Sequence, residues 1–206
     1  MSQSYCRLFL ATPDCFDLPE LQHIFAAAIS GGDIASLLIR QTDTGKLKEA
    51  AMALTGMAQQ AGIAVVIDTD VEIAMACGAD GVQVAGDVHA YVDAREKIGA
   101  DKIVGVYCGS DRHAAMSLGE VGADYVAFSN EAAVGDLEPE AHWWARLFEV
   151  PCVASEPLEI EQAREAAAKR IDFIRPSKSM WTDDKTAKET VRLYNAMIRD
   201  TQIETD

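Results

Sequence analysis

The sequence predicts an α/β fold, a single (β/α)8 TIM barrel spanning residues 1–206. Short apolar segments alternate with segments of helical periodicity, eight of each, along the chain. The tripeptide Gly-Ala-Asp recurs from Gly78, Gly99 and Gly122, and a regular interval of this length is typical of repeated βα units. The alternative is an open doubly wound sheet. An open sheet exposes its edge strands to solvent, and none of the predicted strands carries enough polar residues for that position, so a closed barrel is favoured.

The first half of the chain contains the clearest units. Runs rich in β-branched residues predict strands at residues 7–12, 34–39, 64–67 and 82–85. Between and after them, helical spacing of apolar residues predicts helices that begin at Asp17, Thr44, Glu72 and His89. Gly78 ends the third of these helices, as glycine commonly does in the left-handed conformation.

The second half repeats the alternation less regularly. Strands are predicted at residues 102–107, 125–128, 152–155 and 173–175, and helices at 112–121, 140–148, 158–170 and 182–199. Trp143 and Trp144 are adjacent, so at most one of them faces the barrel. Residues 200–206 are polar and are expected to form a frayed tail.

Composition excludes several classes of partner. A net charge of −15 argues against nucleic acid and against an anionic membrane surface, because both require basic faces. The chain has no apolar run of membrane-spanning length and no apolar N-terminal signal, so a cytoplasmic protein is expected. The five cysteines lack a CxxC pair and are interpreted as reduced packing residues. The four histidines fall on predicted helices without a partner at ligand spacing, which predicts surface positions.

In a barrel of this type the active site lies where the strands end. The polar residues that follow the predicted strands are Asp14, Arg40, Asp68, Asp70, Asp87, Tyr107, Cys108, Ser129, Asn130, Ser155, Glu156, Ser177, Lys178 and Ser179. The irregular segment 130–139 is a candidate active-site loop. Cys108 has no histidine at a neighbouring strand end to activate it, so packing is the favoured interpretation.

Three carboxylates end neighbouring strands. Asp68 and Asp70 are two residues apart on an extended segment, and Asp87 leaves the next strand. Mg²⁺ commonly takes one or two carboxylates and completes its shell with water and substrate phosphates, so Asp68 and Asp87 are candidate ligands. The alternative is that these residues cap the helices that follow them.

Two further positions suit an anionic group. The guanidinium of Arg40 would face the same mouth and could bind a phosphate or carboxylate bidentately, or it could form a salt bridge with Asp68 or Asp70. Ser177, Lys178 and Ser179 follow the eighth strand, where such barrels often bind a substrate phosphate. The alternative for this run is a solvated loop.

Several segments together resemble the thiamine phosphate synthase and thiazole tautomerase superfamily. They are Arg40 after the second strand, Val66–Ala74, Gly78–Val84, Ile103–Val106 and Gly122–Val126. The resemblance implies a (β/α)8 barrel of thiamine biosynthesis. It implies a transferase that joins a pyrimidine diphosphate to a thiazole phosphate with Mg²⁺ and releases pyrophosphate. Because barrels of this family often pair through their outer helices, it also makes a homodimer an expectation.

The family motifs match this chain in part. Arg40 matches the arginine of the Leu-Arg-x-Lys motif, whose lysine is replaced by Thr42. Asp68-Thr69-Asp70 occupies the position of the family's Asn-Asp-Arg, which holds pyrophosphate and metal, and Gln83 replaces a histidine. Asp87 is the match to a second metal-binding aspartate, offset by about one position.

The later motifs depart further. Tyr107 replaces a serine, and Ser129-Asn130-Glu131-Ala132 takes the place of the Thr-x-Thr-Lys loop. Ser155-Glu156 occupies the position of the family's phosphate-binding Gly-Gly, so that only Ser177 or Ser179 remains to bind that phosphate. The diphosphate site has therefore lost two lysines and gained a carboxylate at Asp70, which weakens its expected affinity for a polyanion.

Three functions follow as hypotheses. The first is an enzyme of this family, with Arg40, Asp68, Asp70 and Tyr107 catalytic and Gln83, Ser129, Asn130, Ser177, Lys178 and Ser179 contacting a phosphorylated substrate. The second is a catalytically silent barrel that binds a ligand or partner. The third is a lyase or isomerase acting on another phosphorylated small molecule, with Lys178 or an aspartate as the base.

Overall fold

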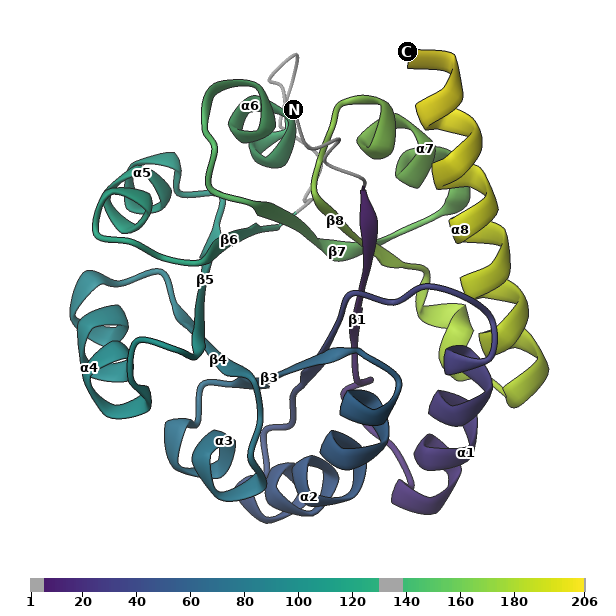
Figure 1. Cartoon of the computed structure of the whole chain (residues 1–206), viewed down its shortest axis with the longest axis horizontal. Helices are drawn as coiled ribbons and strands as arrows, with labels where there is room; N and C mark the ends of the chain where they lie inside the picture. Colours follow the sequence, from purple (N-terminus) through teal and green to yellow (C-terminus); the bar gives the residue numbers. More distant parts are fainter. Residues whose placement is uncertain (1–5, 130–138, 206) are drawn as a thin grey trace.

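The fold is a closed barrel of parallel strands surrounded by helices, as Figure 1 shows in a view through the ring. The computed structural model describes residues 6–129 and 139–205. Within these ranges each strand pairs with the next and the last pairs with the first. The strands are β1 Arg7–Ala11, β2 Ser36–Ile39, β3 Ala64–Asp68, β4 Gly81–Ala85, β5 Ile103–Gly109, β6 Tyr125–Phe128, β7 Cys152–Leu158 and β8 Phe173–Pro176. The predicted (β/α)8 barrel is confirmed, and the open sheet is excluded.

A helix follows each strand and packs on the outside of the barrel (Figure 1). The helices are α1 Leu18–Ile29, α2 Thr44–Gln60, α3 Val71–Cys77, α4 Val88–Ile98, α5 Arg112–Glu120, α6 Glu140–Leu147, α7 Ile160–Ala168 and α8 Asp184–Thr205, with a short 3₁₀ helix, η1, at Lys178–Trp181. The first five helices each begin after an aspartate whose side chain accepts a hydrogen bond from the backbone three residues on. None of the helices in the described ranges is both long and apolar enough to cross a membrane.

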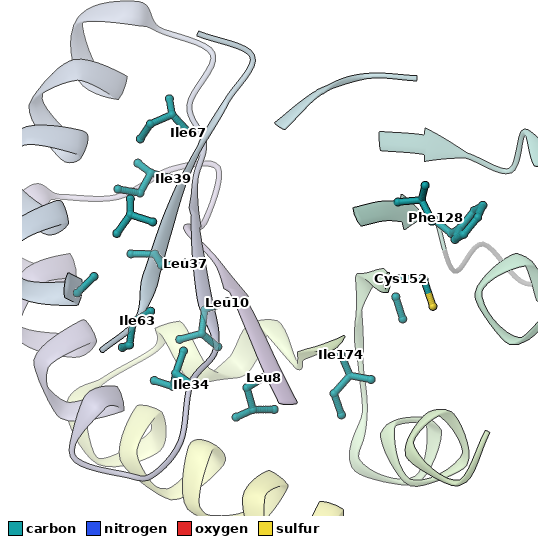
Figure 2. Close-up of a cluster of buried hydrophobic side chains, with 14 of the residues drawn as sticks. Leu8, Leu10, Ile34, Leu37, Ile39, Ile63, Ile67, Phe128, Cys152 and Ile174 are labelled. Carbon is teal, nitrogen blue, oxygen red and sulfur yellow. The ribbon is translucent and has the colours of Figure 1, made fainter. Parts of the chain in front are cut away.

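The core has two layers because strand side chains alternate between the two faces of the barrel. Outward-facing residues such as Leu37, Ile39 and Ile67 are buried between the strands and the helices, and Figure 2 shows them on the helix side. Inside the barrel, Phe9 packs edge-on against Tyr125, with ring centroids 5.8 Å apart. Gly105 makes room for the Tyr125 ring, since a Cβ there would lie 2.0 Å from its Cζ. The interior is therefore filled below the mouth.

At the amino end of the barrel, aspartates hold the backbones of neighbouring strands. Asp80, just before β4, accepts a hydrogen bond of 2.7 Å from the backbone N–H of Val65 in β3. Asp124 before β6 and Asp172 before β8 do the same for the backbone N–H groups of Val104 in β5 and Cys152 in β7. Two of the three Gly-Ala-Asp turns thus serve as interstrand staples. Asp101, in the remaining turn, precedes β5 and does not bond to a neighbouring strand in this way within the described residues.

Two predicted boundaries differ from the structure by more than two residues. Residue Leu158, expected in a helix, ends β7, because an irregularity in register between Ala154 and Pro157 lets the strand continue. The last helix, expected to stop at Arg199, runs to Thr205. Buried Thr201 extends its inner face, and its hydroxyl donates to the Met197 carbonyl. The tryptophan prediction is confirmed, because Trp144 is buried and Trp143 is only partly so.

Candidate active site at the carboxyl end of the barrel

The mouth of the barrel is lined by side chains that continue the inward face of the strands. Leu38, Val66, Ala127, Val153 and Phe173 belong to the interior cluster. Two residues further along the same strands stand Arg40, Asp68, Ser129, Ser155 and Arg175. Since side chains two apart on a strand share a face, these five lie above the filled interior. Tyr107, two residues beyond Gly105 on β5, is also on this face and is 38% exposed.

Arg40 is held at the end of β2 by Thr12, a buried residue just beyond β1. The Thr12 hydroxyl accepts a hydrogen bond from the Arg40 N–H and donates one to the Arg40 carbonyl, both at 2.9 Å. The guanidinium lies 3.4 Å from a carboxylate oxygen of Asp14, so the expected salt bridge to Asp68 or Asp70 was assigned to the wrong partner. Both side chains of this pair are well exposed, and such pairs contribute little stability. Arg40 is therefore open to an anionic ligand.

Arg175 was missed among the polar strand ends because it was read as the last residue of an apolar strand. It is only 8% exposed, and its Nη1 donates to the Ser155 carbonyl at 3.2 Å. Burial lowers the pKa of the guanidinium, as does the positive charge of Arg40, against the opposite effect of Glu156 and Asp14. The signal was present in the sequence, because Arg175 shares the face of Phe173 and opposes outward-facing Ile174.

A chain of hydrogen bonds connects the barrel interior to Asp68. The buried hydroxyl of Tyr125 donates to Gln83 Oε1 at 3.1 Å, and Gln83 Nε2 donates to Asp68 Oδ1 at 3.4 Å. Burial raises the pKa of the Asp68 carboxyl, and the nearby Arg40 charge and the Gln83 bond lower it by less. Gln83, predicted to contact substrate, is 4% exposed and lies beneath Asp68. It orients the Asp68 carboxylate from below.

Asp70 and Asp87 both serve as helix caps. Asp70 accepts a hydrogen bond from Ile73 N–H, and Asp87 accepts one from Ala90 N–H, as the alternative interpretation of these residues predicted. Thr69 between Asp68 and Asp70 has a φ of 63°, a left-handed conformation that is strained for a β-branched residue. Across the described ranges, no group of three or more histidine, cysteine or acidic side chains is placed to hold a metal. A Mg²⁺ site on Asp68 and Asp87 stays a prediction that needs substrate oxygens to complete it.

The serines after β8 are not in a solvated loop. Ser177 is buried, and its hydroxyl donates to a carboxylate oxygen of Glu159 at 2.6 Å. The Ser179 hydroxyl donates to that of Ser177 at 3.2 Å, while Lys178 is exposed. With the Glu159 carboxylate already bonded to Ser177, this run presents a negative charge beside the position where a phosphate was expected.

The remaining candidates differ in exposure. Cys108 faces outward and is buried, and burial together with Asp111 raises its pKa to about 12, which confirms a packing role. Ser129 is buried, with its N–H bonded to the Gly109 carbonyl at 3.0 Å. Asn130 and most of the candidate loop 130–139 lie outside the described residues. The geometry thus brings together Arg40, Asp68, Tyr107 and the unpredicted Arg175.

Comparisons with known proteins agree in one family. The family profile described as thiamine monophosphate synthase matches residues 8–178. A thiamine-phosphate synthase of Rhodospirillum centenum is 34% identical, over 94% of this chain and 98% of the relative. The corresponding protein of Hyphomonas neptunium is 32% identical, over 93% of each chain.

Solved structures support the same architecture. A thiamine phosphate pyrophosphorylase from Pyrococcus furiosus superposes with a TM-score of 0.76 at 19% identity, covering 95% of this chain and 96% of the other. A 3-hexulose-6-phosphate synthase from Salmonella typhimurium gives a TM-score of 0.71 at 18% identity, over 94% and 99% of the two chains. At these identities the likeness shows the fold alone.

Proposed function

The chain belongs to the thiamine monophosphate synthase family, and from that premise we propose that its barrel mouth joins a pyrimidine diphosphate to a thiazole phosphate and releases pyrophosphate. The single observation that carries this proposal is the similarity to thiamine-phosphate synthases along nearly the whole chain. The position of Arg40 at the mouth supports it, because a guanidinium there can bind the leaving diphosphate.

The proposed roles follow from exposure and charge. Arg40 neutralises charge that develops on the leaving oxygen, which lowers the barrier when the donor is fixed in advance by its surroundings. Thr12 fixes the backbone from which this guanidinium extends, through its two bonds to Arg40 N–H and C=O. Tyr107, partly exposed on β5, offers a ring face against a heteroaromatic substrate.

Mg²⁺ fits this mouth only as a substrate-dependent ion. The desolvated carboxylate of Asp68 is the natural protein ligand, with Asp87 as a second, and the substrate's phosphate oxygens would complete the shell. When bound, the ion would neutralise phosphate charge. The chain itself keeps Asp68 oriented through Gln83, whether or not the ion is present.

The experiment is a coupled assay of pyrophosphate release with the pyrimidine diphosphate and the thiazole phosphate, with and without added Mg²⁺. Turnover that requires Mg²⁺ and is reduced in Asp68→Asn is the expected result. Absence of turnover at micromolar to tens of micromolar protein would contradict the proposal. A homodimer stays a prediction, which light scattering on the purified protein would check.

A catalytically silent binding barrel is the second candidate, and a specific observation favours it. Asp70 and Asp87 are each engaged as helix caps, so neither needs a metal to explain its position. This candidate predicts ligand binding without turnover and without dependence on metal. The exposed position of Lys178 gives no support to the third candidate, a lyase or isomerase that uses it as a base.

A further inference from the structure

We propose that Arg175 and Arg40 together form a phosphoryl-binding site on the side of the mouth built by β8, β1 and β2. This inference rests on the proposed function for the identity of the bound group, a phosphoryl group of the substrate or product.

The first step is the position of Arg175. Its side chain shares the inward face of β8 with Phe173 and is 8% exposed, so it lies in the upper interior of the barrel. The hydrogen bond from Nη1 to the Ser155 carbonyl fixes one edge of the guanidinium. On β1, between β8 and β2, the inward residue is Ala11, whose side chain is small.

The second step is the missing partner. A buried arginine is costly unless it is paired, and arginine is almost never buried without such pairing. Among the described residues no carboxylate lies within 4.0 Å of Arg175. The charge that acts on it most strongly is the positive charge of Arg40, and Glu156 and Asp14 each oppose that effect less strongly, from beyond ion-pair distance. Two like charges directed into one mouth destabilise each other. Folding alone therefore does not account for this arrangement, and an anion between them would.

The third step is the class of anion. A guanidinium presents a planar fork of donors that matches phosphate oxygens, and two of them match the charge of a diphosphate better than that of a single carboxylate. The competing position after β8 is already negative, because Glu159 bonds to Ser177 there. The phosphoryl group is therefore assigned to the arginine side of the mouth.

The test measures binding, not turnover. Isothermal titration at low ionic strength would compare pyrophosphate, inorganic phosphate and malonate, a dicarboxylate, as ligands of the wild-type protein. The variants are Arg175→Met, which removes the charge at similar volume, and Arg175→Lys, which keeps it. The matched control is Arg192→Gln on the outside of α8, which removes one positive charge from an exposed ion pair. Circular dichroism would confirm that each variant is folded.

Wild type and Arg192→Gln are expected to bind pyrophosphate equally. Arg175→Met should weaken binding about tenfold or more, which is the loss expected for one charge-assisted pair. The pyrophosphate affinity of Arg175→Lys should lie between those of wild type and Arg175→Met, because an ammonium keeps the charge but lacks the planar pair of donors of a guanidinium. Pyrophosphate should also raise the melting temperature of wild type more than that of Arg175→Met.

Three results would overturn the inference: equal pyrophosphate affinity in wild type and folded Arg175→Lys and Arg175→Met, tighter binding of malonate than of pyrophosphate, or an equal loss in Arg192→Gln. These results are separable from the failure of the proposed function. Pyrophosphate binding that depends on Arg175 without any turnover would support this site and contradict the synthase activity. Turnover by the wild type, with unchanged pyrophosphate binding in the Arg175 variants, would support the synthase activity and contradict this site.

Discussion

The two ends of the barrel use charged side chains in different ways. At the amino end, Asp80, Asp124 and Asp172 each accept a backbone N–H from the preceding strand, so their positions are explained by folding. At the carboxyl end, Arg175 and Asp68 are desolvated without an ion-pair partner within the described ranges. In (β/α)8 barrels the amino end serves stability and the carboxyl end serves chemistry. The functional end is therefore distinguished by desolvated charge without an ion-pair partner, and not by the mere presence of charge.

The largest effect is expected from removing Arg40. Arg40→Met should reduce kcat/KM for pyrophosphate release about 100-fold, because a charge-assisted contact of ~2–3 kcal/mol to the diphosphate is lost. Stability should be nearly unchanged, since the Asp14 pair is exposed and the Thr12 bonds involve only the Arg40 backbone. Steady-state kinetics and a thermal melt would measure both. Unchanged kinetics would remove Arg40 from the site and weaken the contrast between the two ends.

At the amino end the expected effect is on stability alone. Asp80→Ala leaves the Val65 N–H without its acceptor, so the free energy of unfolding should fall by about 2 kcal/mol. Asp101→Ala is the matched control. Asp101 occupies the same place in a Gly-Ala-Asp turn, and no hydrogen bond of its side chain occurs within the described ranges. Urea unfolding would compare the two variants. Equal losses of unfolding free energy would show that the hydrogen bond from Val65 to Asp80 does not stabilise the amino end.

A smaller effect separates the two interpretations of Asp87. Asp87→Ala should lower the free energy of unfolding by about 1 kcal/mol through loss of the α4 cap, whereas Asp87→Asn should preserve it, because asparagine caps as well as aspartate. If Asp87 also holds Mg²⁺, Asp87→Asn will require more Mg²⁺ for half-maximal activity. A Mg²⁺ titration of turnover decides, and an unchanged requirement would leave Asp87 as a cap only.

Most of the fold was predictable because it depends on local patterns. Apolar runs and glycine stops located every strand and α-helix to within two residues, apart from the end of β7 and the end of α8, while the 3₁₀ helix η1 was not predicted. Leu158 was misplaced because the register irregularity arises from pairing with β8, a separate strand that begins at Phe173. Such pairing leaves no local signal.

The site was only partly predictable, for the same reason. The inward direction of Arg40 and Asp68 follows from strand alternation, and alternation applied within β8 would also have found Arg175. Hydrogen-bond partners could not be read in this way. Ser177 bonds to Glu159, eighteen residues earlier, and Arg40 pairs with Asp14 on the loop that follows β1. Which polar groups are satisfied depends on tertiary contacts, and that decides between a structural and a functional role.

The smallest expected effect is on the pH dependence of stability. It has opposite signs for two aspartates, one at each end of the barrel. Burial raises the pKa of Asp68 in the folded state, so its charged form opposes folding, and stability is lost as the pH rises through the folded pKa. Asp33 at the amino end has a lowered pKa because it accepts two hydrogen bonds from Arg7, both 2.7 Å. Its contribution is present above the unfolded pKa and is lost as the pH falls through the folded value.

The two asparagine variants should therefore respond oppositely to pH. Relative to wild type at pH 7, Asp68→Asn should be more stable and Asp33→Asn less stable. The Asp68→Asn difference should shrink as the pH falls through the raised folded pKa of Asp68 towards 3.8, the ordinary aspartate value, whereas the Asp33→Asn difference should persist to pH 3.8 and shrink only below it. Thermal melts from pH 7 to below pH 3.8 would measure both differences. A less stable Asp68→Asn at pH 7 would mean that Arg40 compensates the Asp68 charge fully in the free protein. The carboxyl end would then hold one uncompensated charge, Arg175, and the argument for an anion at the mouth would depend on that residue alone.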